Sequence, residues 1–281
     1  MGNSLGSVSE RTNPGRTDDF QREAKEILTP DLFDGLRVEI GQSLSQNLGL
    51  THSFVMGSST VPSHYQLGAN YLRDKIFVTG RFDHAGRLSG AVRVQPLKEL
   101  ASKFEFLLGR SKAECGCLAE VELRGRDFTG ELQASSAGAT TARWHQAVTD
   151  RVSVVGEGVY HRAKKVSLLQ GGLRFATPDS VTTLSGSSMG QLITSYTHSL
   201  TDRLSLATEL FMQPRTHDAI FSVGYQVKLR KAIVRGMVVS NGRVMASVKD
   251  EIAPNTALLL SGDLNYLANE YKFGLGLILG Q

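Results

Sequence analysis

Tyr271-Lys-Phe-Gly-Leu-Gly-Leu-Ile-Leu279 is the stretch that decides how this 281-residue chain folds. Successive residues of a β-strand point to opposite faces. One face therefore carries Tyr271, Phe273, Leu275, Leu277 and Leu279, and the other carries Lys272, Gly274, Gly276 and Ile278. Stretches of this kind recur back to residue 35, and none is long and apolar enough for a transmembrane helix. In lipid such strands are satisfied only when the sheet closes and leaves no unpaired edge. The sequence therefore predicts an all-β fold, a closed transmembrane β-barrel.

Composition sets limits on the class of protein. A hydrophobic fraction of 41% is that of a soluble protein, but a barrel exposes only alternate residues to lipid and keeps a polar lumen. The net charge of +4 permits an anionic partner, although the Lys and Arg residues are spread along the chain, which argues against nucleic acid. Cys115 and Cys117 have no second Cys or His pair at ligand spacing, so neither a disulfide framework nor a metal site is expected.

Residues 1–34 are predicted to be a flexible N-terminal segment with a short amphipathic helix at about residues 18–29. Acidic residues fill the first turn of this helix and Pro30 follows its end. Its apolar side chains form one stripe, namely Phe20, Ala24, Ile27 and Leu28. This stripe must be buried, and we expect it inside the lumen. No apolar run of a secretory signal precedes the helix, which argues against a bacterial outer-membrane porin.

Residues 35–281 are predicted to form the barrel itself. Turn signals such as Asp83-His-Ala-Gly86 and Ser240-Asn-Gly242 recur roughly every 13 residues. Strands placed between these turns number about nineteen. An odd number requires the first and last strands to pair in parallel. Single-chain bacterial barrels have even numbers, whereas the mitochondrial voltage-dependent anion channel has 19 strands, so the count favours a mitochondrial barrel.

Five segments carry a family signal beyond barrel physics: Glu23–Arg37, His64–Tyr71, Arg124–Phe128, Gly156–Tyr160 and Ser222–Tyr225. Together they resemble the channel-forming subunit of the protein translocase of the mitochondrial outer membrane (the TOM complex), within the mitochondrial porin superfamily. The likeness covers nearly the whole chain and is greatest to the plant and algal versions. It implies a pore in the mitochondrial outer membrane through which unfolded precursor proteins are imported, with no enzymatic activity.

The resemblance also implies partners. These are precursor proteins with basic presequences, the receptor and small helical subunits of the translocase, membrane lipid and a second barrel in an oligomer. Mitochondrial barrels carry a carboxyl-terminal sorting signal of the form polar-x-Gly-x-x-apolar-x-apolar. Lys272, Gly274, Leu277 and Leu279 match it position by position. The net basic charge departs from what a pore for cationic presequences leads one to expect.

Acidic side chains predicted to face the lumen are the candidate site. If the more apolar face of each strand points to lipid, four glutamates on consecutive strands point inward: Glu105, Glu120, Glu122 and Glu131. Such a patch would attract basic presequences over a Debye length of about 8–10 Å. In the alternative interpretation these glutamates only keep the lumen wet, paired with Arg81, Arg93, Arg124 and Arg235. Further inward candidates are Glu39, Glu157 and Glu209.

Two other functions stay open at this point. The first is a metabolite and ion pore of the same fold, like the voltage-dependent anion channel, which a net basic wall would favour. The second is a soluble all-β binding protein whose strands form a sandwich. The seven His residues are scattered, and the Gly274 and Gly276 spacing has no following helix, so neither a catalytic set nor a nucleotide-binding loop is expected. No cofactor is predicted.

Overall fold

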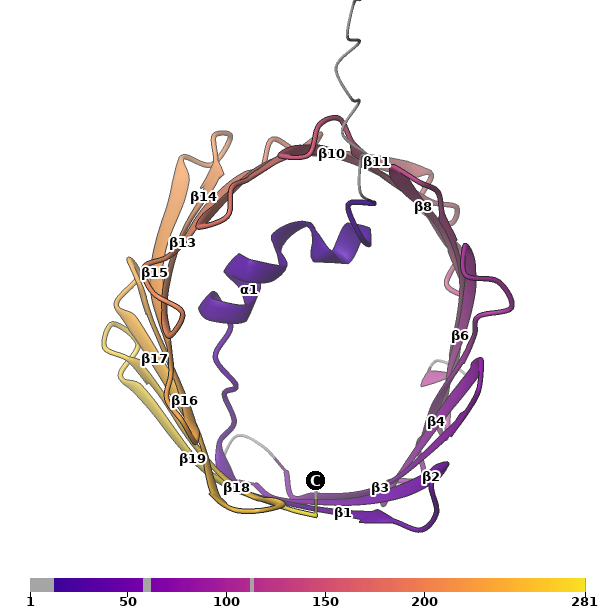
Figure 1. Ribbon diagram of the computed structural model, residues 1–281, viewed down its shortest axis with the longest axis vertical. Coiled ribbons are helices and arrows are strands. Elements are labelled where there is room, and N and C mark those ends of the chain that lie inside the picture. The colour runs from indigo at the N-terminus through magenta and orange to yellow at the C-terminus, as the bar shows by residue number, and fades with distance from the viewer. Residues whose placement is uncertain (1–12, 58–61, 112–113, 281) are drawn as a thin grey trace, which may run out of the picture.

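The computed structural model describes residues 13–57, 62–111 and 114–280 of the chain. Within these ranges nineteen strands form one sheet that closes on itself (Figure 1). Neighbouring strands pair antiparallel, except that the first and the last pair in parallel, from Gly35 opposite Gly274 to Ile40 opposite Leu279. The predicted closed barrel is confirmed. Its strands are β1 (Gly35–Ser43), β2 (Leu48–Met56), β3 (His64–Arg73), β4 (Ile76–Asp83), β5 (Leu88–Val94), β6 (Leu100–Leu108), β7 (Gly116–Arg124), β8 (Phe128–Ser135), β9 (Ala139–Ala147), β10 (Val152–His161), β11 (Val166–Ala176), β12 (Ser180–Ser187), β13 (Leu192–Ser199), β14 (Leu204–Gln213), β15 (Asp218–Lys228), β16 (Ala232–Val239), β17 (Arg243–Ala253), β18 (Thr256–Asn265) and β19 (Glu270–Leu279).

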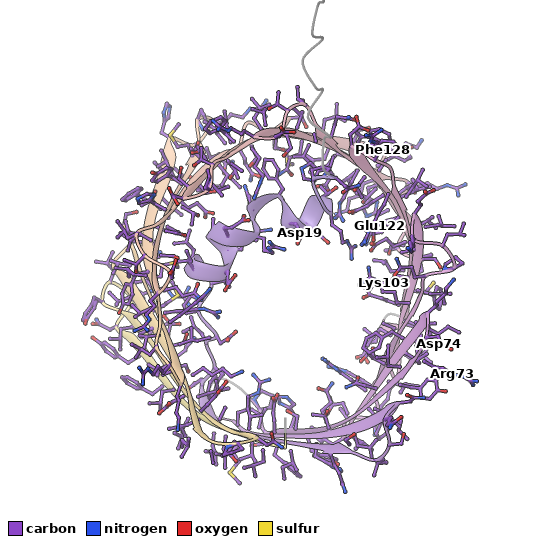
Figure 2. All side chains as sticks on the ribbon, in the orientation of Figure 1. Asp19, Arg73, Asp74, Lys103, Glu122 and Phe128 are labelled. Atoms are coloured by element: carbon purple, nitrogen blue, oxygen red, sulfur yellow. The ribbon has the colours of Figure 1, made fainter. Side chains whose placement is uncertain are left out.

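The two faces of the wall differ in polarity. Large apolar side chains such as Leu132 and Phe273 are exposed on the outside, while Thr183 and Ser195 are buried on the inside. Figure 2 shows Phe128 on the outer face, with side chains such as Lys103 and Glu122 directed into the lumen. An apolar belt around a polar interior is the arrangement that a bilayer requires of a barrel.

A short helical segment lies in the lumen against one side of the wall (Figure 1). It begins as a 3-10 helix, η1 (Thr17–Gln21), and continues as α1 (Arg22–Leu28), whereas the sequence suggested one helix over about 18–29. Pro30, which cannot continue an α-helix, follows the C-cap residue Thr29. Neither helix is long and apolar enough to span a membrane in the part of the chain that is described.

The apolar stripe of this segment is what holds it to the wall. Ala24, Ile27 and Leu28 form a buried cluster with Ala207 of β14, and Met237 of β16 packs against it. Burying a side chain the size of Ile27 contributes on the order of 1.5–3 kcal/mol. The chain then crosses to β18 and β19, where Phe33 packs on a second cluster and Ser261 Oγ donates to the Phe33 carbonyl at 2.7 Å.

The loops at the two ends of the barrel follow a regular scheme. We call the end that carries the loops after even-numbered strands the even rim, and the other end the odd rim. On the even rim, every second loop has a glycine whose backbone is in the left-handed conformation (positive φ), which residues with a Cβ rarely adopt. A larger side chain from the next loop along this rim lies near each of them. The glycines are equally spaced along the sequence: Gly86, Gly138, Gly190 and Gly242.

Candidate functional site

Three of the four predicted glutamates meet on the inner wall. Glu122 of β7 lies directly opposite Glu131 of β8, and Glu120 is the next inward residue along β7. Their side chains are only 8%, 3% and 1% exposed for Glu120, Glu122 and Glu131. We call these three residues the acidic cluster. Carboxylates so deeply buried are stable in ionised form only when they are paired.

The pairing group is supplied by the N-terminal segment. The guanidinium of Arg16 forms an ion pair with Glu120, and its Nε lies 3.6 Å from Glu122 Oε2 and 3.8 Å from Glu131 Oε1. The backbone N–H of Thr17 donates to Glu131 Oε1 at 3.0 Å. Burial works to lower the pKa of Arg16, but the carboxylates around it outweigh this effect and raise the pKa. Arg16 thus stays charged in its site.

Cations of the wall complete the neutralisation. Arg124 donates to Glu122 at 2.5 Å and Arg93 lies 3.7 Å from the same carboxylate. Arg143 of β9 approaches Glu131 at 3.5 Å and Glu157 at 3.4 Å. Around the acidic cluster, three carboxylates therefore face four guanidinium groups. This is an ion-pair network that holds the N-terminal segment.

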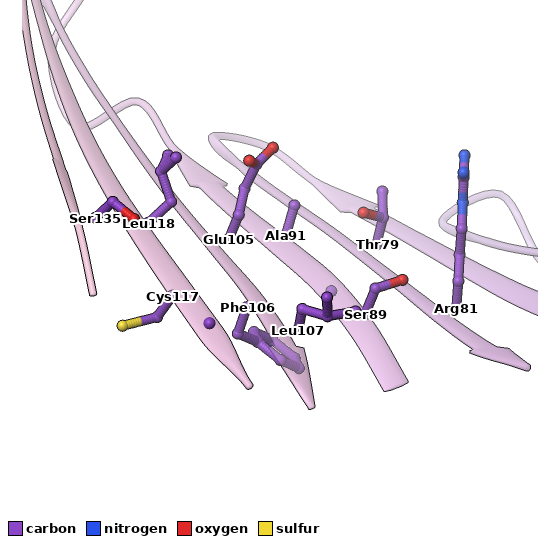
Figure 3. Close-up of a pocket in the computed structure, with 12 residues that line it drawn as sticks. Thr79, Arg81, Ser89, Ala91, Glu105, Phe106, Leu107, Cys117, Leu118 and Ser135 are labelled. Carbon is purple, nitrogen blue, oxygen red and sulfur yellow. The ribbon is translucent and has the colours of Figure 1, made fainter. Parts of the chain in front are cut away.

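Glu105 stands apart from the acidic cluster. Its carboxylate is 42% exposed and accepts from Lys103 Nζ of the same strand at 2.6 Å. Lys103 lies opposite Glu120 and so separates Glu105 from the cluster. Glu105 lines a shallow pocket in the wall with Thr79 and Arg81, whose side chains point to the same side of the sheet (Figure 3). Of the four residues, Glu105 is the one open to the lumen.

The other predicted inward residues also lie on the wall, and most have partners. Arg235 pairs with Glu26 and Asp31 of the N-terminal segment at 3.8 and 3.6 Å. Glu39 pairs with Arg37 on its own strand. Glu209 of β14 is half-buried beneath the helical segment.

A bidentate ion pair fixes the helical segment to β11. Arg174 Nη1 and Nη2 donate to the two carboxylate oxygens of Glu23 at 2.7 and 2.8 Å, and Nη1 also donates to the Phe20 carbonyl at 2.9 Å. Burial acts to raise the pKa of Glu23, but the hydrogen bonds from Arg174 outweigh it and lower the pKa. Glu23 is therefore a charged anchor at neutral pH.

The first described residues are attached as well. Asn13 Nδ2 donates to the carbonyls of Gly125 and Phe128 at 2.8 and 2.9 Å, and Thr129 Oγ1 donates to Asn13 Oδ1 at 3.0 Å. The segment therefore approaches the odd rim at the loop after β7. The sequence predicted that residues 1–34 are flexible. The first twelve of them lie outside the residues that the structure describes.

Sequence reasoning missed three of the residues that build this site. Arg143 and Arg174 have the inward parity of their strands, so the alternation used for the glutamates would have found them. Arg16 lies in a segment without periodicity, and its partner Glu120 is 104 positions away. No local pattern signals that contact.

The residues of the predicted sorting signal lie on β19, next to the seam with β1. Lys272 and Gly274 have the inward parity, and Leu277 and Leu279 the outward one. A Cβ at Gly274 would collide with the Phe33 carbonyl oxygen. The glycine is therefore needed for the N-terminal segment to pass over the strand.

Comparison with known proteins places this geometry in context. A family model described as eukaryotic porin matches residues 13–274. The probable mitochondrial import receptor subunit TOM40-2 of Arabidopsis thaliana is 28% identical, over 92% of this chain and 88% of its own length. The mitochondrial import receptor subunit TOM40 homologs of Xenopus laevis and Homo sapiens are 28% and 27% identical, each over 95% of this chain and over 84% and 78% of their own lengths.

Among solved structures, a triple mutant of the Rhodopseudomonas blastica porin matches with a TM-score of 0.54. The alignment covers 86% of this chain and 95% of that one, at 8% identity. At this level of identity the likeness concerns the barrel architecture alone.

Proposed function

The chain belongs to the eukaryotic porin family, and we propose that it is the protein-conducting channel through which unfolded precursors cross the mitochondrial outer membrane. The observation that carries this function is its similarity, over nearly its whole length, to proteins named mitochondrial import receptor subunit TOM40. The closed barrel with an apolar outer belt supplies the pore that such a function requires.

The path of the precursor runs beside the helical segment. Helix α1 packs on β13 to β16 and η1 on β9, on the side of the lumen away from β1 to β6, which leaves that wall uncovered (Figure 1). With the described side chains drawn, the centre of the lumen remains open (Figure 2). An α-helix with side chains is about 10–12 Å across, and the lumen already holds one beside this opening. A helical presequence has the same diameter as this helix, and an extended chain is no wider.

Basic presequences would meet the acidic residues in two stages. Glu105 is exposed and is the first contact. The acidic cluster is occupied by Arg16, so a presequence arginine reaches Glu120, Glu122 and Glu131 only by replacing Arg16. Replacing the Arg16 guanidinium by that of a presequence arginine changes the net free energy little. The presequence is therefore not bound so tightly at the acidic cluster that its transit would stop.

The chain is proposed to act within a translocase. Its partners would be receptor and small helical subunits and a second barrel, and precursor transit requires no catalysis from it. Lys272, Gly274, Leu277 and Leu279 are proposed as the signal by which β19 is recognised during insertion. Strand β19 is suited to this role because it closes the barrel against β1.

A metabolite and ion pore is the second candidate. The uncovered wall favours it in one respect, because four basic residues have inward parity there and only three acidic ones. The basic residues are Arg37, Arg81, Arg93 and Lys103, and the acidic ones are Glu39, Asp83 and Glu105. Such a wall prefers small anions. The reversal potential of the full chain in a planar bilayer under a salt gradient separates the two, since cation preference fits the import channel and anion preference fits the metabolite pore.

Block by peptide tests the import function directly. A basic presequence peptide should interrupt the current through the reconstituted chain, and a peptide of the same length with its basic residues replaced by Gln should not. The variant with Glu105, Glu120, Glu122 and Glu131 all changed to Gln should be blocked less. The control changes two carboxylates elsewhere on the wall, Glu39 and Glu209, to Gln and should behave like the unaltered chain. Equal block of all three proteins would remove the glutamates from the presequence path.

A further inference from the structure

The two rims of the barrel differ in charge. The described even-rim loops carry exposed basic residues after β6, β10 and β14. Their one carboxylate, Glu114, lies 3.7 Å from Arg87. The strand-end carboxylates Asp83, Asp218 and Glu270 have inward parity and so belong to the lumen. We call the following residues the basic arc: Arg110, Arg162, Lys164, Lys165 and Arg215.

The odd rim is balanced by comparison. In its described loops most basic residues have an acidic neighbour in sequence. The pairs are Asp74 with Lys75, Lys98 with Glu99, Arg126 with Asp127, Asp150 with Arg151 and Asp202 with Arg203. Arg230 and Lys231 are the exception on the odd rim. Most of the unbalanced positive charge therefore lies at the even rim, the end opposite the loop that Asn13 contacts.

Basic side chains of the arc continue the lipid-facing side of their strands. Arg162 follows Tyr160 by two residues, and its backbone N–H donates to the Gly138 carbonyl at 2.8 Å, so the strand pairing extends through Arg162. Arg110 likewise follows Leu108 by two residues, just beyond the end of β6. Tyr160 and Leu108 are about half exposed on the outer face. Both arginines therefore follow the outward face at a strand end, where the apolar belt gives way to the rim.

The arginines of the arc also lie against neighbouring loops of the rim. Arg110 lies over Gly86 of the preceding even-rim loop, where a Cβ added to the glycine would be 3.2 Å from Arg110 Nε. Arg215 lies over Gly190 of its preceding loop in the same way, with a distance of 3.7 Å from Arg215 Nε. For Arg162 it is the Cβ atom that would lie 3.7 Å from a Cβ at Gly138. Each arginine thus covers an adjacent loop. The loops 240–242 and 266–269, beyond the arc, carry no charged residue.

We infer that the basic arc binds the phosphate groups of anionic phospholipids in the leaflet at the even rim. Two features favour lipid over a soluble acidic protein. The described loops after β10 and β14 are only a few residues long, so their side chains stay near the bilayer surface. The outward parity of Arg110 and Arg162 places them beside headgroups, and guanidinium groups match phosphate oxygens in charge and geometry.

The test compares variants that lose equal charge at opposite rims. The arc variant carries R110Q, R162Q, K164Q, K165Q and R215Q. The control variant carries K98Q, R151Q, R203Q, R230Q and K231Q on the odd rim. Each full-length chain is reconstituted into vesicles of phosphatidylcholine containing a minority of phosphatidylglycerol, and the ratio of the two lipids in contact with protein is measured with spin-labelled analogues. Equal pore conductance shows that both variants have folded.

The unaltered chain should enrich phosphatidylglycerol at its surface, and the enrichment should fall at high salt. In the arc variant it should drop by about threefold or more, while the control keeps it. Equal enrichment in the two variants would overturn the proposal. The proposal would also be overturned if the arc variant kept its enrichment of phosphatidylglycerol but no longer bound polyglutamate. The arc would then be a docking surface for an acidic protein. Peptide block, measured on the same samples, reports separately on the import function.

Discussion

Arg16 Nε lies 3.6 Å from Oε2 of Glu122, a carboxylate on the inner wall of β7 that is otherwise almost sealed from water. This contact means that the most acidic part of the wall is already occupied by the chain's own N-terminal segment. The segment is held at a second place by Arg174 and at a third by its apolar stripe. These three attachments can be tested one at a time.

Replacing Arg16 with Gln should release the start of the segment from the acidic cluster. Charge-assisted hydrogen bonds of this kind contribute about 1.5–3 kcal/mol, so detachment should become roughly tenfold or more frequent. Single-channel recordings should show added current fluctuations, together with tighter block by a basic presequence peptide. Arg22 is 66% exposed with only long contacts to carboxylates, so R22Q is the control. If R16Q and R22Q are blocked alike, Arg16 does not compete with the presequence.

Acid should loosen the attachment at Arg174. The pKa of Glu23 is lowered in the folded chain, so its ion pair contributes fully above the ordinary value of 4.5 and is lost as the pH falls through the lowered value. Conductance recorded from pH 7 downward should therefore stay steady to about pH 4.5 and become unstable below it. In E23Q this acid transition should be absent, with fluctuations present already at neutral pH. An identical pH profile for both proteins would rule out Glu23 as the group that titrates.

The apolar stripe can be weakened without changing charge. Ile27 is 3% exposed, and I27A should reduce the docking free energy of the helical segment by about 2–5 kcal/mol. Protease cleavage after residues 22 and 25 should become faster in I27A than in the unaltered barrel. The control L267A removes an equally large side chain that is 77% exposed at the even rim, and its cleavage rate should not change. Matched rates for I27A and L267A would mean that the stripe does not hold the segment.

A methyl group at the seam should impair closure of the barrel. In G274A the new Cβ would meet the Phe33 carbonyl, whereas in G262A on the next strand it would make only ordinary contacts of 3.8 Å with Phe273. Refolding into detergent should give a lower yield of heat-resistant barrel for G274A than for G262A. Because no insertion machinery is present, a defect there is steric. A defect of G274A seen only during insertion into mitochondria would instead assign Gly274 to the sorting signal.

The barrel could be predicted from sequence because its information is local. Alternation fixes the face of each residue, turn residues such as Asn241-Gly242 fix the ends of strands, and strand order follows chain order. The meeting of Glu122 with Glu131 followed from the same rules. The place of Arg16 did not, because it depends on a contact between an aperiodic segment and a distant strand. The isolation of Glu105 by Lys103 depends on register, which parity alone does not give.

The parallel seam between β1 and β19 has a consequence for biogenesis. Strand β1 is synthesised first among the strands and cannot complete its backbone hydrogen bonds until β19 has been made. Any sheet formed by a shorter nascent chain has two edge strands with unpaired backbone N–H and C=O groups. Such edges can pair with other copies of the chain and cause aggregation. Chaperones must therefore bind the chain until β19 has been synthesised, because the barrel can close only then.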